Sequence, residues 1–301
     1  MLIALAIRCT EPYSLNTENF EDYLVVEATI TNEYKHHKIT LTRTFPLENE
    51  DIPYEHNATV YISDSEGNSI NFDEEDNSYI SETEFSAEAG KSYTLHIKTT
   101  DGEEYVSENV QLTTATPLSS VNAVRMNYYG VDGVAILVNS YDPNNASQFY
   151  RYEYEETSKI VVPKPSNDSL VVSGYDENTY TFSIDQRTSE SKTCFKTVNS
   201  NDILQYSTVD QNEDRVNDFI IRFISKDDYT IANGYSILAK QYIQSSSSYF
   251  YYKTLNDINA SGEILSPMQP GFLYGNLSCT TNSNKKVVGF FDMSFYSESR
   301  V

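Results

Sequence analysis

The sequence predicts an all-β protein of antiparallel strands with one short helix. Three observations predict this class. The 301 residues include 25 Tyr and 14 Phe, and aromatic residues favour strands. Apolar and polar residues alternate in many short runs, as they do in half-buried strands. Turn signals rich in Gly, Asp and Asn separate these runs about every ten residues, which is typical of a β-sandwich.

The chain is strongly acidic. It has 21 basic and 44 acidic residues, which gives a formal net charge of -23 and a pI near 4.4. This charge repels nucleic acid and anionic membrane surfaces, so we expect no nucleic-acid partner. The mean hydropathy is -0.50, but the regular alternation of apolar residues indicates a folded chain with wide polar surfaces.

The N-terminus resembles the end of a secretion signal whose start is missing. The apolar run 1–7 resembles the tail of such a signal and is too short to span a membrane. Lipoprotein signals end just before a Cys that then receives lipid, which makes Cys9 the candidate lipidation site. Ile7 and Arg8 are not the small residues that such signals favour, so an unmodified Cys9 is the alternative. Residues 1–19 are therefore expected to be a residual signal and lipid-anchor tether.

The first domain is expected over residues 20–116. The run 23–31 places Leu24, Val26, Ala28 and Ile30 on one face, as a strand with one face in the core does. Alternation resumes after a polar tip that contains His36 and His37, which we interpret as a solvated turn. Further alternating runs are 39–45, 59–63, 69–72, 92–98 and 104–112.

Two other segments of this domain carry information about its type. The stretch 89–95 resembles the corner and strand of immunoglobulin-like and fibronectin-like sandwiches, in which a Tyr hydroxyl bonds back to the backbone. The acidic run 73–76 lacks the register of a calcium-binding loop and is interpreted as a solvated loop.

A larger antiparallel β domain is expected over residues 117–301. The segment 114–120 contains Pro117 and lacks alternation, and new strand patterns follow it. In 245–259 a Ser-rich start precedes apolar residues at helical spacing, which predicts one short helix that covers an open end of the second sheet. The last run, 289–301, stops without a turn, so we expect the native chain to continue.

Tyr150, Tyr152 and Tyr154 lie two residues apart and therefore share one face of a strand. An aromatic ladder of this kind can stack against sugar rings or a peptide, which makes it a candidate binding face. The alternative is a ladder that the core or a neighbouring domain covers.

Cys194 and Cys279 are predicted to form a disulfide. Both fall in the second domain, and in an oxidising compartment a pair is more simply explained as a bridge than as two thiols. Closing a loop of this length would stabilise the fold by roughly 4 kcal/mol on the chain-entropy model. Two separately buried thiols are the alternative.

Catalytic and cofactor motifs are scarce. His36, His37, His56 and His96 all fall in the first domain, and no G-x-S-x-G elbow accompanies them. The 11 Gly form no phosphate-binding motif, and no Cys/His pattern has metal-ligand spacing, so we expect neither cofactor nor metal. Paired carboxylates about 5 to 10 Å apart would be needed for a hydrolase, which spacing along the chain does not test.

Several segments, taken in order, resemble a family of Gram-negative outer-membrane lipoproteins catalogued as domain of unknown function 4249. Together they extend over nearly the whole chain. They are Cys9-Thr10-Glu11-Pro12-Tyr13 and the runs 21–28, 130–136, 150–154, 222–225, 235–242 and 269–272.

The resemblance implies a lipid-anchored outer-membrane protein that is encoded beside a TonB-dependent receptor of the starch-utilisation type and works with it. It brings no catalytic residues. Family members generally carry a full signal and a longer C-terminus than this chain.

The leading hypothesis is a non-catalytic outer-membrane lipoprotein that captures a ligand for, or docks onto, a TonB-dependent nutrient uptake system. The membrane is then a partner only through the lipid anchor, and the sequence does not identify the ligand. A surface adhesin or structural coat protein is the alternative. A concave Tyr-lined pocket would favour the first hypothesis, and flat polar faces would favour the second.

Overall fold

The computed structural model describes residues 22–46, 51–176, 179–188, 192–260 and 272–301. Within these ranges the chain forms nineteen strands, one α-helix and one 3-10 turn. The predicted all-β class with a single α-helix is confirmed.

The first domain is a single bent sheet of mostly short strands around one apolar core, where the sequence predicted a β-sandwich. Ten strands contribute to it, and two of them, β18 and β19, come from the C-terminal end of the chain. Alternation buries one face of each strand, for example Leu24, Val26, Ala28 and Ile30 of β1. The strands are β1 (Leu24–Thr31), β2 (Lys38–Arg43), β3 (Thr59–Asp64), β4 (Ser69–Glu75), β5 (Ser78–Ser81), β6 (Ser92–Lys98), β7 (Glu104–Ser107), β8 (Val110–Gln111), β18 (Leu277–Cys279) and β19 (Val287–Arg300).

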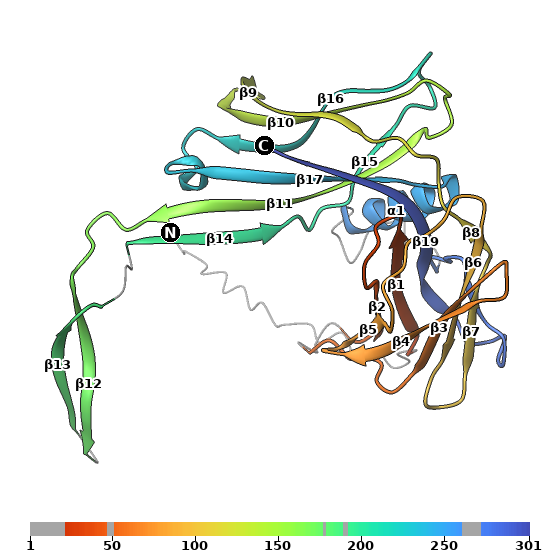
Figure 1. Ribbon diagram of the computed structural model, residues 1–301, viewed down its shortest axis with the longest axis horizontal. Helices are drawn as coiled ribbons and strands as arrows, with labels where there is room; N and C mark the ends of the chain where they lie inside the picture. Colours follow the sequence, from red (N-terminus) through yellow and green to blue (C-terminus); the bar gives the residue numbers. More distant parts are fainter. Residues whose placement is uncertain (1–21, 47–50, 177–178, 189–191, 261–271) are drawn as a thin grey trace, which may run out of the picture.

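Strand β19 belongs to both domains. Its first half pairs in parallel with β1, from Leu24 opposite Val287 to Thr31 opposite Ser294. Its second half pairs antiparallel with β17 (Tyr235–Ile243) in the second domain. Figure 1 shows this long blue strand running from one domain into the other. Residues 117–301 were predicted to form the second domain. However, Leu277, Phe291 and Met293 lie in the core of the first domain.

The second domain has two layers. The central sheet consists of β14 (Thr193–Asn199), β11 (Phe149–Val161), β17 and the end of β19, with β15 (Leu204–Ser207) also paired to β11. The cover sheet consists of β16 (Asp214–Ser225), β10 (Val131–Asp142) and β9 (Leu118–Tyr128). Apolar side chains of both sheets meet between the layers and form a second core. The 3-10 turn η1 (Tyr229–Ile231) lies between β16 and β17.

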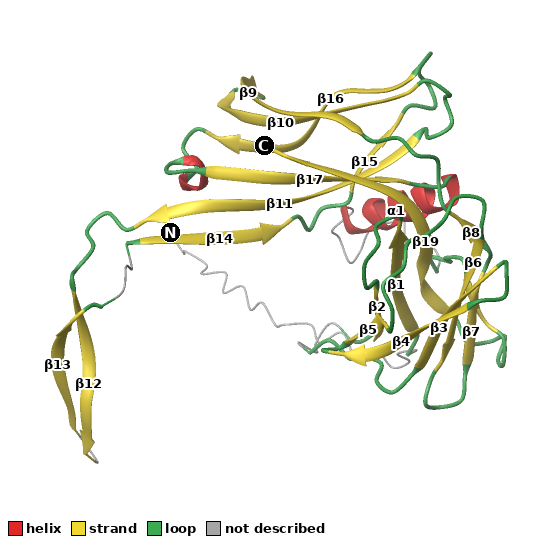
Figure 2. Cartoon of the chain, viewed as in Figure 1, coloured by secondary structure: helices red, strands yellow, loops and turns green. Residues whose placement is uncertain are grey.

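Helix α1 (Ser246–Ala260) lies close to the predicted range 245–259. The Ser245 hydroxyl accepts a hydrogen bond from the backbone N–H of Ser248 at 3.1 Å, which caps the helix as its Ser-rich start indicates. The helix contacts β11 and β19, and the Tyr251 ring lies 5.4 Å from that of Phe290. In Figure 2 the helix lies where the two domains meet.

The chain between β11 and β14 extends into a hairpin, which we call the arm. It consists of β12 (Asp168–Asp176) and β13 (Thr179–Gln186), which pair only with each other. Figure 1 shows the arm projecting from one end of the central sheet, away from both cores.

Gly289 of β19 has a φ of 134°, and an added Cβ would lie 2.1 Å from the carbonyl oxygen of Val26 in β1. Gly289→Ala should therefore push the two paired backbones apart and lower the free energy of unfolding by about 3 kcal/mol or more. Urea unfolding followed by circular dichroism measures this.

Gly174→Ala is the matched control, because its Cβ would make only ordinary contacts, the nearest 3.8 Å away. We expect it to change the free energy of unfolding by less than about 0.5 kcal/mol. Equal stabilities for the two variants would contradict the close approach of β1 and β19.

Candidate functional site

The three predicted ladder tyrosines do not form an accessible binding face. Tyr150 and Tyr152 are fully buried, and Tyr154 is 9% exposed. The alternation correctly places them on one face of β11, but the cover sheet packs on that face. Which face of a strand is covered depends on distant strands, so the sequence pattern left this open.

The ladder hydroxyls are satisfied inside the core. Tyr150 donates to Oδ1 of Asp214 at 2.7 Å, and Tyr152 donates to Oε1 of Gln241 at 3.1 Å. Burial, together with the Asp214 carboxylate, raises the pKa of Tyr150 well above its usual range. Asp214 also accepts from the Thr208 hydroxyl at 2.6 Å and from the backbone N–H of Gln148 at 2.9 Å. These contacts are typical of core stabilisation.

A second buried carboxylate, Asp142, holds the turn that precedes β11. It accepts backbone N–H bonds from Asn144 and Ala146 at 2.9 Å and from Ser147 at 3.1 Å. Burial opposes the charged form, but these donors outweigh it and lower the pKa of Asp142 below its ordinary value.

Asp142→Asn should lower the free energy of unfolding at neutral pH by about 2 kcal/mol, because an amide NH₂ replaces one accepting oxygen. A carboxyl group whose pKa is lower in the folded state stabilises the folded protein at pH values above its unfolded-state pKa of about 3.9. This stabilisation is lost as the pH falls through the folded-state pKa. The difference from wild type should therefore shrink below about pH 4. Urea unfolding at roughly pH 3 to 8 measures the difference in unfolding free energy between wild type and variant. A difference that stays constant over this pH range would contradict the lowered pKa of Asp142. The exposed Asp227→Asn is the control.

The predicted disulfide is wrong. Cys194 lies exposed on β14 opposite Ile160, whereas Cys279 is buried on β18 opposite Tyr105, and both thiols are free. The two cysteines belong to different domains because β18 returns to the first one. Cys9 lies outside the described residues, so its lipidation stays a prediction.

A thiol reagent should therefore modify Cys194 in the folded protein and Cys279 only after unfolding. Peptide mass spectrometry after brief maleimide treatment, with and without urea, checks this expectation. Equal modification of both in the native state would contradict the burial of Cys279.

The four histidines are engaged in structural contacts. His37 is buried, contrary to the predicted solvated turn, and its Nε2 contacts the carbonyl oxygens of Glu33 and Phe85 at 3.2 and 3.0 Å. Burial, reinforced by the nearby Lys35, lowers the pKa of His37. The remaining contacts are His36 to the Ser81 carbonyl, His56 to Glu74, and His96 to Ser63 and the Tyr61 ring.

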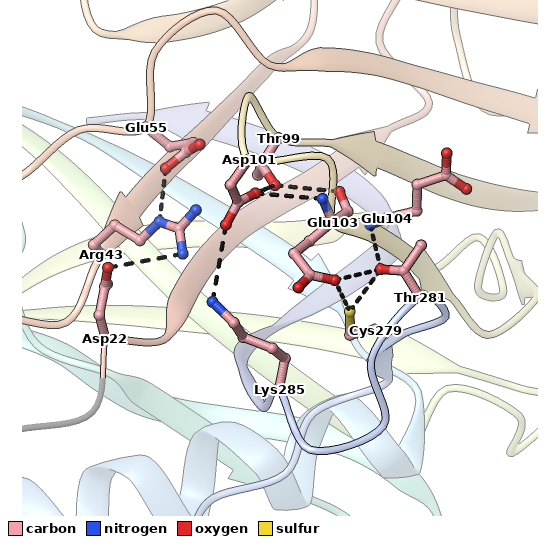
Figure 3. A network of polar contacts seen from close by, with 10 residues as sticks. All are labelled: Asp22, Arg43, Glu55, Thr99, Asp101, Glu103, Glu104, Cys279, Thr281 and Lys285. Atoms are coloured by element: carbon pink, nitrogen blue, oxygen red, sulfur yellow. Dashed lines mark hydrogen bonds and ion pairs between the residues drawn. The ribbon is translucent and has the colours of Figure 1, made fainter.

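A polar network fastens the C-terminal segment to one end of the first domain (Figure 3). Glu103 accepts hydrogen bonds from the Thr281 hydroxyl and, at 3.5 Å, from the Cys279 thiol. Lys285 reaches Asp101 at 3.8 Å. Beside them, Arg43 and Glu55 form a largely buried ion pair at 2.6 Å. The network therefore stabilises the docking of β18 and the loop that follows it.

A second polar cluster lies at the junction of the domains. The Arg151 guanidinium lies between the rings of Tyr242 and Tyr252, at 4.5 and 4.8 Å from their centroids. Asp292 is fully buried and accepts from the hydroxyls of Ser248 and Ser294 at 2.7 and 2.9 Å. This ties α1 to β19. In the described part of the chain no group of His, Cys, Asp and Glu side chains is suited to hold a metal ion.

Within the described chain, the arm is the hairpin whose exposed apolar side chains gather on one face. Cross-strand pairs place six large apolar or aromatic side chains on one face, and each is 53–73% exposed. The rings of Tyr175 and Tyr180 lie 5.0 Å apart. We call this set the arm face: Leu170, Val172, Tyr175, Tyr180, Phe182 and Ile184.

The opposite face of the arm is mostly polar and includes Ser169, Ser183 and Asp185, with Val171 the exception. The arm is thus an amphipathic hairpin. The sequence analysis did not predict it, although the alternation over 180–185 was visible. Such alternation predicts strands, but it does not reveal that nothing in the described chain covers them.

A family model described as "Domain of unknown function (DUF4249)" matches residues 10–300. The chain belongs to this family. The family resemblance seen in the sequence is thereby confirmed, and the matched range includes both domains and the arm. No match was found among curated proteins. None of the helices in the described part of this DUF4249 protein has the length and apolar character needed to cross a membrane.

The base of the arm in this DUF4249 protein is basic, although the whole chain carries a net charge of -23. Lys159 on β11, Lys164 in the connection to β12 and Lys196 on β14 make no ion pair within the described residues. Lys164 and Lys196 are exposed. The base of the arm therefore offers cations to a partner, beside the exposed carboxylates Asp168 and Asp185 of the arm itself.

Proposed function

We propose that this DUF4249 protein is a non-catalytic, lipid-anchored accessory component of a TonB-dependent nutrient uptake system in the outer membrane, and that it acts by docking onto the receptor. The observation that supports docking is the uncovered apolar arm face, while the lipid anchor and the receptor are what the family resemblance implies. Exposed apolar patches organised on one element mark interaction surfaces, because their exposure to water costs free energy that a partner recovers.

The geometry supports docking more than ligand capture. A concave pocket lined by the ladder tyrosines would have favoured capture, but those side chains are buried in the core. The arm instead offers an extended, projecting surface, which suits contact with a large partner. Flat polar faces would have favoured a structural coat protein, and the apolar arm face does not fit that description.

The proposal is tested by purifying the tagged full-length protein from gently solubilised outer membranes and analysing its companions and its N-terminal peptide by mass spectrometry. We expect a TonB-dependent receptor in stoichiometric amount and a lipid on Cys9. Cys9→Ser should move the protein from the membrane fraction to the soluble fraction, while Cys194→Ser, the control, should not. Recovery of the protein alone with unmodified Cys9 would overturn the proposal.

A further inference from the structure

The arm is an incomplete structural unit. A two-stranded hairpin is marginally stable in water by itself and gains stability from a third strand or a packed face. Within the described chain, β12 and β13 have no other strand partner, and the arm face packs on no element. The arm thus has both a hydrophobic face and two strand edges that something else can cover.

We infer that the arm face is the docking surface for the receptor, and that it receives an apolar surface of that protein bordered by carboxylates. This inference rests on the proposed function, because it takes the TonB-dependent receptor as the occupant. The apolar part of the partner is required by the six exposed side chains of the arm face. The acidic border is required by Lys159, Lys164 and Lys196 at the base of the arm, which have no carboxylate partner within the described residues.

A lipid bilayer fits the arm less well. Both outer edges of the hairpin carry backbone N–H and C=O groups without strand partners in the described chain, and each such group costs several kcal/mol in hydrocarbon. A protein surface can satisfy these edges with its own polar groups.

A second copy of the chain also fits less well. A second arm face would bring the same three lysines at its base, and not the carboxylates that these lysines lack. Two chains of charge -23 also repel each other. A partner that covers the arm face and pairs with the three lysines supplies the opposite charge.

Purified full-length protein and the receptor encoded beside it, held in detergent micelles, provide a direct test. Phe182→Ser should raise the Kd for the receptor at least about tenfold, because interface aromatics contribute strongly to binding. Val171→Ser is the matched control on the opposite face of the same hairpin and should leave the Kd within about twofold. Lys164→Glu should slow association at low salt, whereas Lys38→Glu, on exposed Lys38 of β2, should not.

Photo-crosslinking in intact cells provides a second readout. A benzophenone amino acid at position 182 should crosslink to the receptor, while the same group at position 183, on the polar face, should not. Both positions lie on one strand and are partly or largely exposed, so the comparison depends on which face is contacted and not on reach. Equal thermal unfolding of the variants establishes that the effect is not loss of folding.

The outcomes separate the two proposals. If wild type binds the receptor and Phe182→Ser binds equally well, the arm inference is overturned and the proposed function stands. If wild type does not bind the receptor, the proposed function fails and the partner assigned to the arm fails with it. Sedimentation and flotation with phosphatidylethanolamine and phosphatidylglycerol vesicles test the other occupants. Dimers or flotation that Phe182→Ser abolishes would overturn the receptor as occupant.

Discussion

The pairing of one strand with two different domains is the constraint on which the architecture depends. β19 changes partner between Ser294, which lies opposite Thr31 of β1, and Phe295, which lies opposite Ile243 of β17. At such a change backbone donors lose their strand partners and must be satisfied otherwise. The N–H of Phe295 donates to the Thr113 hydroxyl at 2.8 Å, and the N–H of Tyr296 donates to the Asn32 side chain.

The same region concentrates the polar interactions that fasten the C-terminal segment. Asn276 exchanges two hydrogen bonds of 2.8 Å with the backbone of Phe291, and thereby acts as a short extension of the sheet beside β19. Asp292 accepts a hydrogen bond from the hydroxyl of Ser248, which connects β19 to α1, and a second from Ser294 of β19 itself. Removing one partner of such a buried network leaves desolvated polar groups, which costs more than the net value of one hydrogen bond. The two domains are therefore connected through polar contacts as well as through backbone pairing, although Oδ1 of Asp292 and Nε of Arg151 are buried there without a hydrogen-bond partner among the described residues.

The arm contrasts with the covered interior of the two domains. Almost every large side chain of the two cores is covered, whereas the arm face leaves six large side chains in water beside unpaired lysines. The tyrosine ladder is buried and the arm face is exposed. The arm face is therefore the surface that we propose for interaction. The arm and the family match, and not a catalytic group, therefore support the proposed function.

The local features of this protein follow from its sequence. Alternation predicted many of the strands, the Ser-rich start predicted α1, the segments between Cys9 and Phe272 indicated the family, and the acidic composition gives the net charge. Which faces of the strands are covered depends on the tertiary structure. Tyr150 is buried, Phe182 is exposed, and Cys194 and Cys279 are separated, although a period of two residues describes their strands equally well. The reason is that a strand's alternation defines two faces, while the partner that covers one of them comes from distant parts of the chain, as β19 does for β1.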